Sequence, residues 1–137
     1  MKVHTTNYIN TFIQIAEDCP ATEGEIPPVK SEKTMANIQY AMISENPYQY
    51  TSDDVLFQCY ATKNSLKKSD LKKAREAFFS KGQACFRSSP LTKRYGFGVH
   101  SNEEGKIALY GVETSDYRKF SRDKNLTVVR AMRSKKV

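Results

Sequence analysis

The fold is decided by residues 95–112, which read YGFGVHSNEEGKIALYGV. In their first part Tyr95, Phe97 and Val99 alternate with Gly96, Gly98 and His100, and this two-residue period is typical of a strand. A second run of strand-forming residues, Lys106 to Val112, follows the turn-forming residues 101–105. Two such runs joined by a short segment that ends in glycine predict a β-hairpin.

The residues before Gly82 have a different period. Apolar side chains recur there every three or four positions, which predicts helices. The first helix is expected over Ser31 to Glu45, since Asn46-Pro47 stops it. A second begins at Thr51 to Asp54, and a third begins at Ser69-Asp70 and ends before Gly82.

Strand-forming residues also occur near both ends of the chain. We expect a strand over Thr11 to Ala16, and a short helix that Thr114 or Ser115 caps and that runs through Ser121. Leu126 to Met132 suits a strand or a helix, and its β-branched residues favour the strand. The sequence thus predicts one α+β domain, residues 1–133, with a small antiparallel or mixed sheet, followed by a basic tail, residues 134–137.

Composition excludes several classes of protein. Of the 137 residues, 39% are hydrophobic and 27% charged, as in globular proteins. The longest apolar runs are far shorter than the roughly 20 residues of a membrane-spanning helix, and the first twenty residues lack the apolar stretch of a signal peptide. The three cysteines, Cys19, Cys59 and Cys85, contain no CxxC pair, and their odd number favours free thiols and a cytoplasmic location.

The positive charge is concentrated in the last two-fifths of the chain. Residues 1–80 carry nine Lys/Arg against ten Asp/Glu, whereas residues 81–137 carry thirteen against five. This asymmetry favours an anionic partner, either a phosphorylated or carboxylated small molecule or a nucleic acid. A nucleic-acid surface would extend from residues 87–94 to Arg130, Arg133, Lys135 and Lys136.

The segment 85–100 is the strongest candidate for a ligand site. It combines three cations, several hydroxyls and two glycines, and arginine offers a bidentate fork for phosphate or carboxylate. Glycine on a strand leaves room for a ligand or for another part of the chain. The residues expected to bind the anion are Arg87, Ser88, Ser89, Lys93, Arg94, Gly96 and Gly98.

A structural interpretation of the same segment remains open. In it the glycines make room for a packed helix, the cations are solvated, and Arg87 pairs internally with Asp53 or Asp54. The aromatic residues Tyr95 and Phe97 would then form the buried face of the hairpin instead of stacking on bases. Asp53-Asp54 itself is best explained by capping of the second helix, because adjacent helical residues point about 100° apart.

The alternative function is a small enzyme that works without metal or cofactor. Cys85 or His100 would be the reacting group in the same cleft. The two histidines, His4 and His100, lack the spacing of a zinc site, and the sequence contains neither a Walker loop nor a GxSxG motif. The oligomeric state is not predicted.

Several motifs resemble those of a known family. They are Thr11-Phe12-Ile13 with Asp18-Cys19-Pro20, residues 51–57 (TSDDVLF), residues 79–83 (FSKGQ), residues 87–91 (RSSPL) with residues 93–96 (KRYG), residues 105–111 (GKIALYG) and residues 130–135 (RAMRSK). Together they resemble an uncharacterised family of small bacterial proteins, a domain of unknown function. The chain departs from that pattern at Ala84 and Phe97, where the family has proline and tryptophan. The resemblance implies a free-standing bacterial cytosolic protein and brings no activity or cofactor with it.

Overall fold

A four-stranded mixed sheet organises the molecule in the computed structural model, which describes residues 3–134. Its strands are β1 (Thr11–Gln14), β2 (Phe97–Ser101), β3 (Ile107–Gly111) and β4 (Thr127–Arg130), in the order β3-β2-β1-β4. β2 pairs antiparallel with both β1 and β3, and β4 runs parallel to β1. The predicted α+β class, hairpin and final strand are therefore confirmed.

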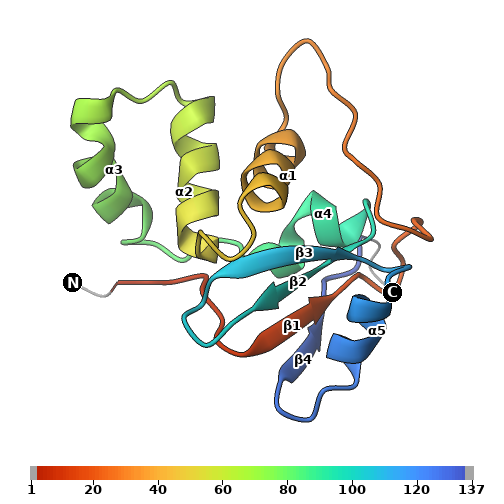
Figure 1. Cartoon of the computed structure of the whole chain (residues 1–137). Coiled ribbons are helices and arrows are strands. Elements are labelled where there is room, and N and C mark those ends of the chain that lie inside the picture. Colours follow the sequence, from red (N-terminus) through yellow and green to blue (C-terminus); the bar gives the residue numbers. More distant parts are fainter. Residues whose placement is uncertain (1–2, 135–137) are drawn as a thin grey trace.

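The helices cover both faces of this sheet (Figure 1). They are α1 (Met35–Glu45), α2 (Ser52–Lys63), α3 (Leu71–Phe78), α4 (Pro90–Lys93) and α5 (Ser115–Ser121), with short 3₁₀ turns at Lys68–Asp70 and Phe86–Ser88. α1 and α4 lie over one face, α5 covers the other, and α2 and α3 extend from one end of the sheet (Figure 1). None of the helices among residues 3–134 is long and apolar enough to cross a membrane.

Successive side chains of β1 point to opposite faces of the sheet and so contribute to two separate packing layers. Ile13 belongs to the main core, which it forms with Val99, Phe86 and Leu91 under α1 and α2. Phe12 points to the opposite face, where its ring meets Tyr117 of α5 edge-on at 5.0 Å. Both Phe12 and Ile13 are fully buried, so β1 is the shared wall of the two layers.

Polar side chains set where the helices begin. Thr51 and Thr114 cap α2 and α5 through hydrogen bonds from Asp54 and Tyr117 backbone amides, as predicted. The first helix begins at Met35 rather than at Ser31, because Thr34 and Asn37 form a reciprocal capping box. The first strand ends at Gln14, two residues earlier than predicted, and a 3₁₀ turn precedes α3.

Candidate functional site

A hollow of about 440 Å³ lies where residues 28–36, at the start of α1, meet residues 88–95 around α4. We call it the basic hollow, because its wall contains three cations and no carboxylate. It is lined by Pro28, Lys30, Thr34, Met35, Ala36, Ser88, Pro90, Lys93, Arg94 and Tyr95. Four of the residues predicted from sequence lie in or beside it: Ser88, Lys93 and Arg94 line it, and Ser89 supports it.

The α4 side of the hollow is held by buried hydroxyl groups. Ser89 Oγ accepts a hydrogen bond from the Leu91 amide at 3.1 Å and donates one to Gln39 Oε1 at 2.5 Å. Thr92 Oγ1 donates to the Phe86 carbonyl oxygen at 2.7 Å. Ser89 and Thr92 are buried, and Ser89 ties α4 to α1. Ser89 therefore positions the wall of the hollow instead of facing its interior.

The opposite side of the hollow is held by the capping box of α1. Thr34 Oγ1 accepts from the Asn37 amide at 3.2 Å, and the Thr34 amide donates to Asn37 Oδ1 at 3.0 Å. Asn37 Nδ2 also donates to the carbonyl oxygens of Pro27 and Pro28, at 3.2 and 3.1 Å. The side-chain amide group of Asn37 thus caps α1 and also fixes the proline segment that leads to Lys30.

The charge of the basic hollow is not neutralised from within the protein. The ion pairs formed among residues 3–134 are Arg75–Asp54, Lys106–Glu104 and Arg133–Glu17, none of which includes a cation of the hollow. The first turn of α1 also carries no acidic side chain. Lys30, Lys93 and Arg94 are therefore free to bind an external oxyanion, with arginine able to contact two of its oxygens.

Comparison with known proteins places the chain in one family. Residues 3–137 match a family of unknown function designated DUF6157. The chain belongs to this family. No curated protein and no solved structure matches it. The match covers nearly the whole chain, in agreement with the resemblance seen in its motifs, and it assigns no activity to the basic hollow.

Arg87 lies within one of the family motifs but does not line the basic hollow. Its Nε donates to the carbonyl oxygen of Arg130 at 2.8 Å, and its own carbonyl oxygen accepts from the Met132 amide at 2.7 Å. The predicted pairing with Asp53 or Asp54 is wrong: Thr5 and Thr6 hydrogen-bond Asp53, and Arg75 pairs with Asp54. Arg87 instead connects the start of the 87–94 segment to β4.

The two glycines leave space that the protein itself fills. A Cβ atom on Gly98 would lie 2.6 Å from Phe12 Cζ and 2.8 Å from Tyr117 Cε2, so this position admits α5. Gly96 has a positive φ of 78°, and a Cβ there would collide with the Glu23 carbonyl oxygen. Gly98 makes room for a packed helix, as the structural interpretation predicted, whereas Gly96 makes room for the loop that contains Glu23. Neither glycine lines the basic hollow.

His100 lies on the α5 face of the sheet, on the side away from α1 and α4. Its Nδ1 is 2.8 Å from Tyr48 Oη, which is in turn 2.7 Å from Tyr110 Oη, and its ring stacks on Phe120 at 4.3 Å. Burial lowers the pKa of His100 below its usual value, although the Asp123 charge opposes the shift. Tyr48 adopts a positive φ of 60° to reach this cluster.

Cys85 contacts Tyr8 and not His100. Its Sγ lies 3.3 Å from the hydroxyl of Tyr8, and all three cysteines are free thiols. Burial raises the pKa of the Tyr8 hydroxyl, and the hydrogen bond with Cys85 raises it further. Neither His100 nor Cys85 lines the basic hollow.

The predicted basic surface along the C-terminal residues is only partly available. Arg133 is paired with Glu17, and this ion pair lowers the pKa of the Glu17 carboxyl. Lys135 and Lys136 lie outside the described residues, as does most of the predicted tail. Ser134, the first tail residue, donates its amide to the Asp18 carboxylate at 3.0 Å.

Lys30 is the cation of the basic hollow that the sequence did not reveal. It is exposed and follows Pro27-Pro28 in the segment before α1. Its contribution depends on the approach of this segment to residues 93–95, about sixty positions later, and no local pattern encodes that contact. The only signal was the location of a lysine between a proline pair and the start of a helix.

Proposed function

We propose that the chain is a binding protein for a small anionic ligand, either phosphorylated or carboxylated, which it holds in the basic hollow. The observation that carries this proposal is the presence of Lys30, Lys93 and Arg94 around one hollow without a carboxylate. Its volume, about 440 Å³, lies within the range of roughly 300–1,000 Å³ typical of small-molecule sites.

The lining suggests how such a ligand would be oriented. Lys93 and Arg94 would bind the oxyanion, since charge-assisted hydrogen bonds are stronger than neutral ones. Tyr95, Pro28 and Met35 would contact the less polar part of the ligand. Binding is favoured over a reaction at this place, because neither His100 nor Cys85 lines the hollow. The odd number of cysteines favours a cytoplasmic setting.

Thermal denaturation of the full chain tests the proposal. Inorganic phosphate is added first, followed by a panel of phosphate monoesters and of di- and tricarboxylates. A ligand that binds the folded protein raises Tm progressively with its concentration. We expect at least one member of the panel to do so, and we expect K93A/R94A to abolish the effect while leaving the Tm of the unliganded protein nearly unchanged.

The matched control is K119A/R122A, which also removes one lysine and one arginine that are exposed, but in and beside α5. It should keep the full response to the ligand. If no anion shifts Tm, or if the two double variants lose the response equally, the basic hollow is not the binding site and the proposal fails.

A further inference from the structure

The α2–α3 limb, which we define as residues 63–81, is strongly basic. It contains seven Lys or Arg residues against two Asp or Glu, a net charge of +5, whereas residues 1–62, which precede it, carry three against eight. The limb comprises the last residue of α2, a loop, and α3. A charge of this density in so short a segment favours an extended anionic partner.

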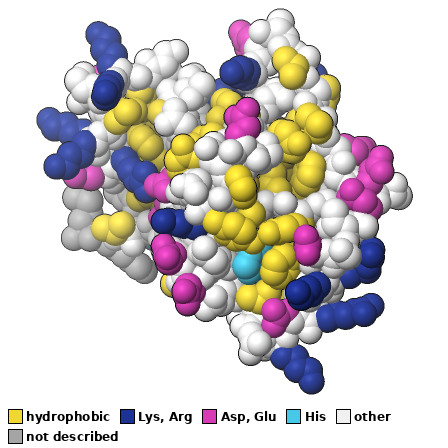
Figure 2. All heavy atoms as spheres, in the orientation of Figure 1, with side chains coloured by type: hydrophobic (Ala, Val, Ile, Leu, Met, Phe, Trp, Pro, Cys, Tyr) yellow, Lys and Arg dark blue, Asp and Glu magenta, His cyan; other side chains and the backbone are white. Residues whose placement is uncertain are grey.

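The lysines of the limb face outward. Leu66, Leu71 and Phe78 turn inward and pack against a small apolar cluster around Phe57 and Phe79. Lys67, Lys68, Lys72 and Lys73 are exposed. Figure 1 places α3 at the far end of the molecule from α5, and Figure 2 shows Lys and Arg side chains gathered over that end. Apolar packing thus fixes the limb on the molecule, while its lysine side chains remain exposed to solvent.

The charge of these four lysines is not neutralised by the protein. Among residues 3–134 the limb forms one ion pair, Arg75 Nη2 with Asp54 Oδ1 at 2.9 Å. The four exposed lysines therefore keep their positive charge toward the solvent. Phosphates bound there would displace only solvent and counterions.

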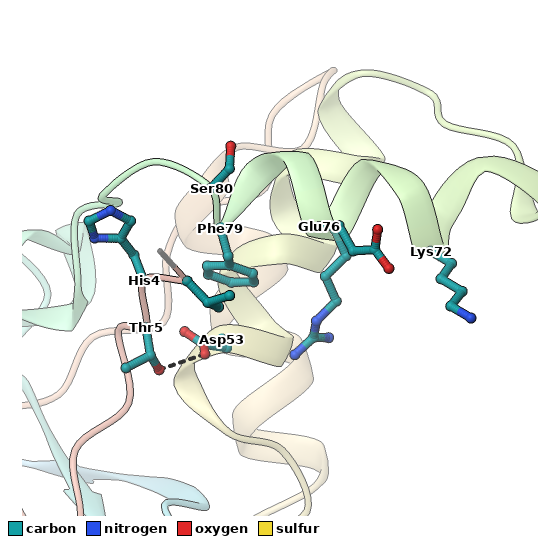
Figure 3. Close-up of a pocket in the computed structure, with 9 residues that line it drawn as sticks. His4, Thr5, Asp53, Lys72, Glu76, Phe79 and Ser80 are labelled. Carbon is teal, nitrogen blue, oxygen red and sulfur yellow. Dashed lines mark hydrogen bonds between the residues drawn. The ribbon is translucent and has the colours of Figure 1, made fainter. Parts of the chain in front are cut away.

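Two hollows open beside Lys72 and Arg75. The N-terminal hollow, about 700 Å³, has Val3 and Phe79 in its wall, together with the carboxylates of Asp53 and Glu76. Figure 3 shows Phe79, Asp53 and Glu76 around it. The Tyr50 hollow, about 760 Å³, is lined by Tyr50, Phe57 and Leu71 among others. Lys72 and Arg75 line both hollows, so the cations stand between two partly apolar recesses.

Arg75 is fixed at the boundary between the hollows. Its Cζ lies 5.8 Å from the centre of the Phe57 ring and 5.6 Å from that of Phe79, and Asp54 holds one of its terminal nitrogens. Guanidinium carries five N–H donors, and this arrangement uses few of them. The group is therefore held in place with donors to spare for a ligand in either recess.

We propose that the α2–α3 limb binds single-stranded nucleic acid. The exposed lysines of the limb bind phosphates, and unpaired bases enter the recesses on the two sides of Lys72 and Arg75. This combination of a cationic track with partly apolar recesses is how proteins bind single strands without sequence preference. A duplex keeps its bases stacked and paired, so it would contact only the lysines.

A membrane surface fits the limb less well. Binding in the interface of a bilayer requires large apolar side chains next to the cations. The strongly exposed apolar residues Val3, Ile9, Ile26, Val29 and Met132 all lie outside residues 63–81, and one of them, Val3, lines a hollow beside the limb. The limb is also separate from the basic hollow, so this inference stands independently of the proposed small-molecule site.

Fluorescence anisotropy with a labelled 20-nucleotide oligo(dT), the corresponding RNA and a duplex of equal length tests the inference. For four phosphate contacts to a single strand, affinity should fall roughly 50-fold between 50 and 200 mM salt. K72A/K73A should weaken binding and reduce the slope of log affinity against log salt by about 1.4. K119A/K124A, which removes two exposed lysines outside the limb, should change neither.

Any of four results would overturn the inference. One is the absence of binding to single strands at 50 mM salt, and another is an equal loss of affinity in the two double variants. The third is duplex binding as tight as single-strand binding, which would mean that the recesses take no part. Preferential binding to anionic lipid vesicles over oligo(dT) would identify the limb as a membrane surface instead.

Discussion

Arg87 Nε donates a hydrogen bond to the backbone carbonyl oxygen of Arg130, 2.8 Å away. In the peptide unit that joins Arg130 to Ala131, the amide of Ala131 donates to Gln14 of β1. The carbonyl oxygen of the same unit must point the opposite way, toward the free edge of the sheet. Arg87 therefore satisfies an acceptor on an edge that no other strand among residues 3–134 covers.

Replacement of Arg87 by alanine should thus act on stability and not on ligand binding. The variant loses one hydrogen bond from a charged donor, but the acceptor is exposed and regains water, so we expect a loss of about 1 kcal/mol in the free energy of unfolding. Urea denaturation measures this loss. Arg87→Ala should keep any Tm response to anions shown by the unchanged protein, and loss of that response at unchanged stability would contradict this assignment.

Gly98→Ala should destabilise the packing of α5 on the sheet. The added Cβ would lie 2.6 Å from Phe12 Cζ and 3.0 Å from the Ile13 carbonyl oxygen, closer than atoms can approach without a shift. Overpacking of this kind typically destabilises a protein by about 1–3 kcal/mol, so we expect Gly98→Ala to lower the free energy of unfolding, measured by urea denaturation, by about 2 kcal/mol. Near-ultraviolet circular dichroism should also change, because Phe12 and Tyr117 contact each other there. Stability equal to that of the unchanged protein would refute this packing.

The sequence predicted those parts of the fold that rest on local patterns. Thr51 and Thr114 cap their helices, and the alternation over residues 97–101 forms the strand β2. The position of β1 between β2 and β4 could not be predicted, since strand order depends on contacts between segments that are far apart in the chain. Tyr48 illustrates the same limit: its positive φ is held by contacts with His100 and Tyr110, more than fifty residues away.

The candidate sites were harder to predict than the fold. Lys93 and Arg94 could be proposed from the 87–94 segment, but whether Arg87 faces the same hollow depends on the path of β4. The basic limb does not show in the net charge of residues 1–80, because acidic residues elsewhere in that region cancel its lysines. The charge of the segment that contains α3 alone does show it.

Asp53 and Asp54 should differ sharply in their contribution to stability. Asp53 accepts hydrogen bonds from Thr5 Oγ1 and from the amide and hydroxyl of Thr6, each at 2.7 Å, and is largely buried. Asp53→Asn would turn an NH₂ group toward some of these donors. It should therefore lower the free energy of unfolding by about 2 kcal/mol. Asp54→Asn keeps an oxygen for capping and loses a half-exposed pair with Arg75, worth about 0.5 kcal/mol. Urea denaturation of both variants measures the difference, and equal losses would contradict it.

His100 should make the protein less stable as the pH falls. Burial lowers its pKa below 6.5 in the folded protein, and the Asp123 charge only partly opposes this shift. The imidazole of His100 contacts Tyr48 and Phe120, its strand partner is Ala108, and Tyr110 lies behind Tyr48. None of these residues carries a carboxylate. Between the lowered pKa and 6.5, the unfolded chain binds a proton at this histidine more readily than the folded chain does.

The contribution of His100 to the free energy of unfolding is therefore present in full above pH 6.5 and declines as the pH falls below that value. The NMR signals of the His100 ring should titrate with a midpoint below 6.5, and urea denaturation from pH 7.5 to 5.5 should show a steeper decline for the unchanged protein than for His100→Gln. Tyr48→Phe separates the two physical causes, because it removes the hydrogen bond to Nδ1 and leaves the ring buried under Phe120. If burial sets the pKa of His100, its titration midpoint stays below 6.5 in Tyr48→Phe. A midpoint at or above 6.5 in that variant would mean that the tyrosine hydroxyl, and not burial, keeps His100 neutral.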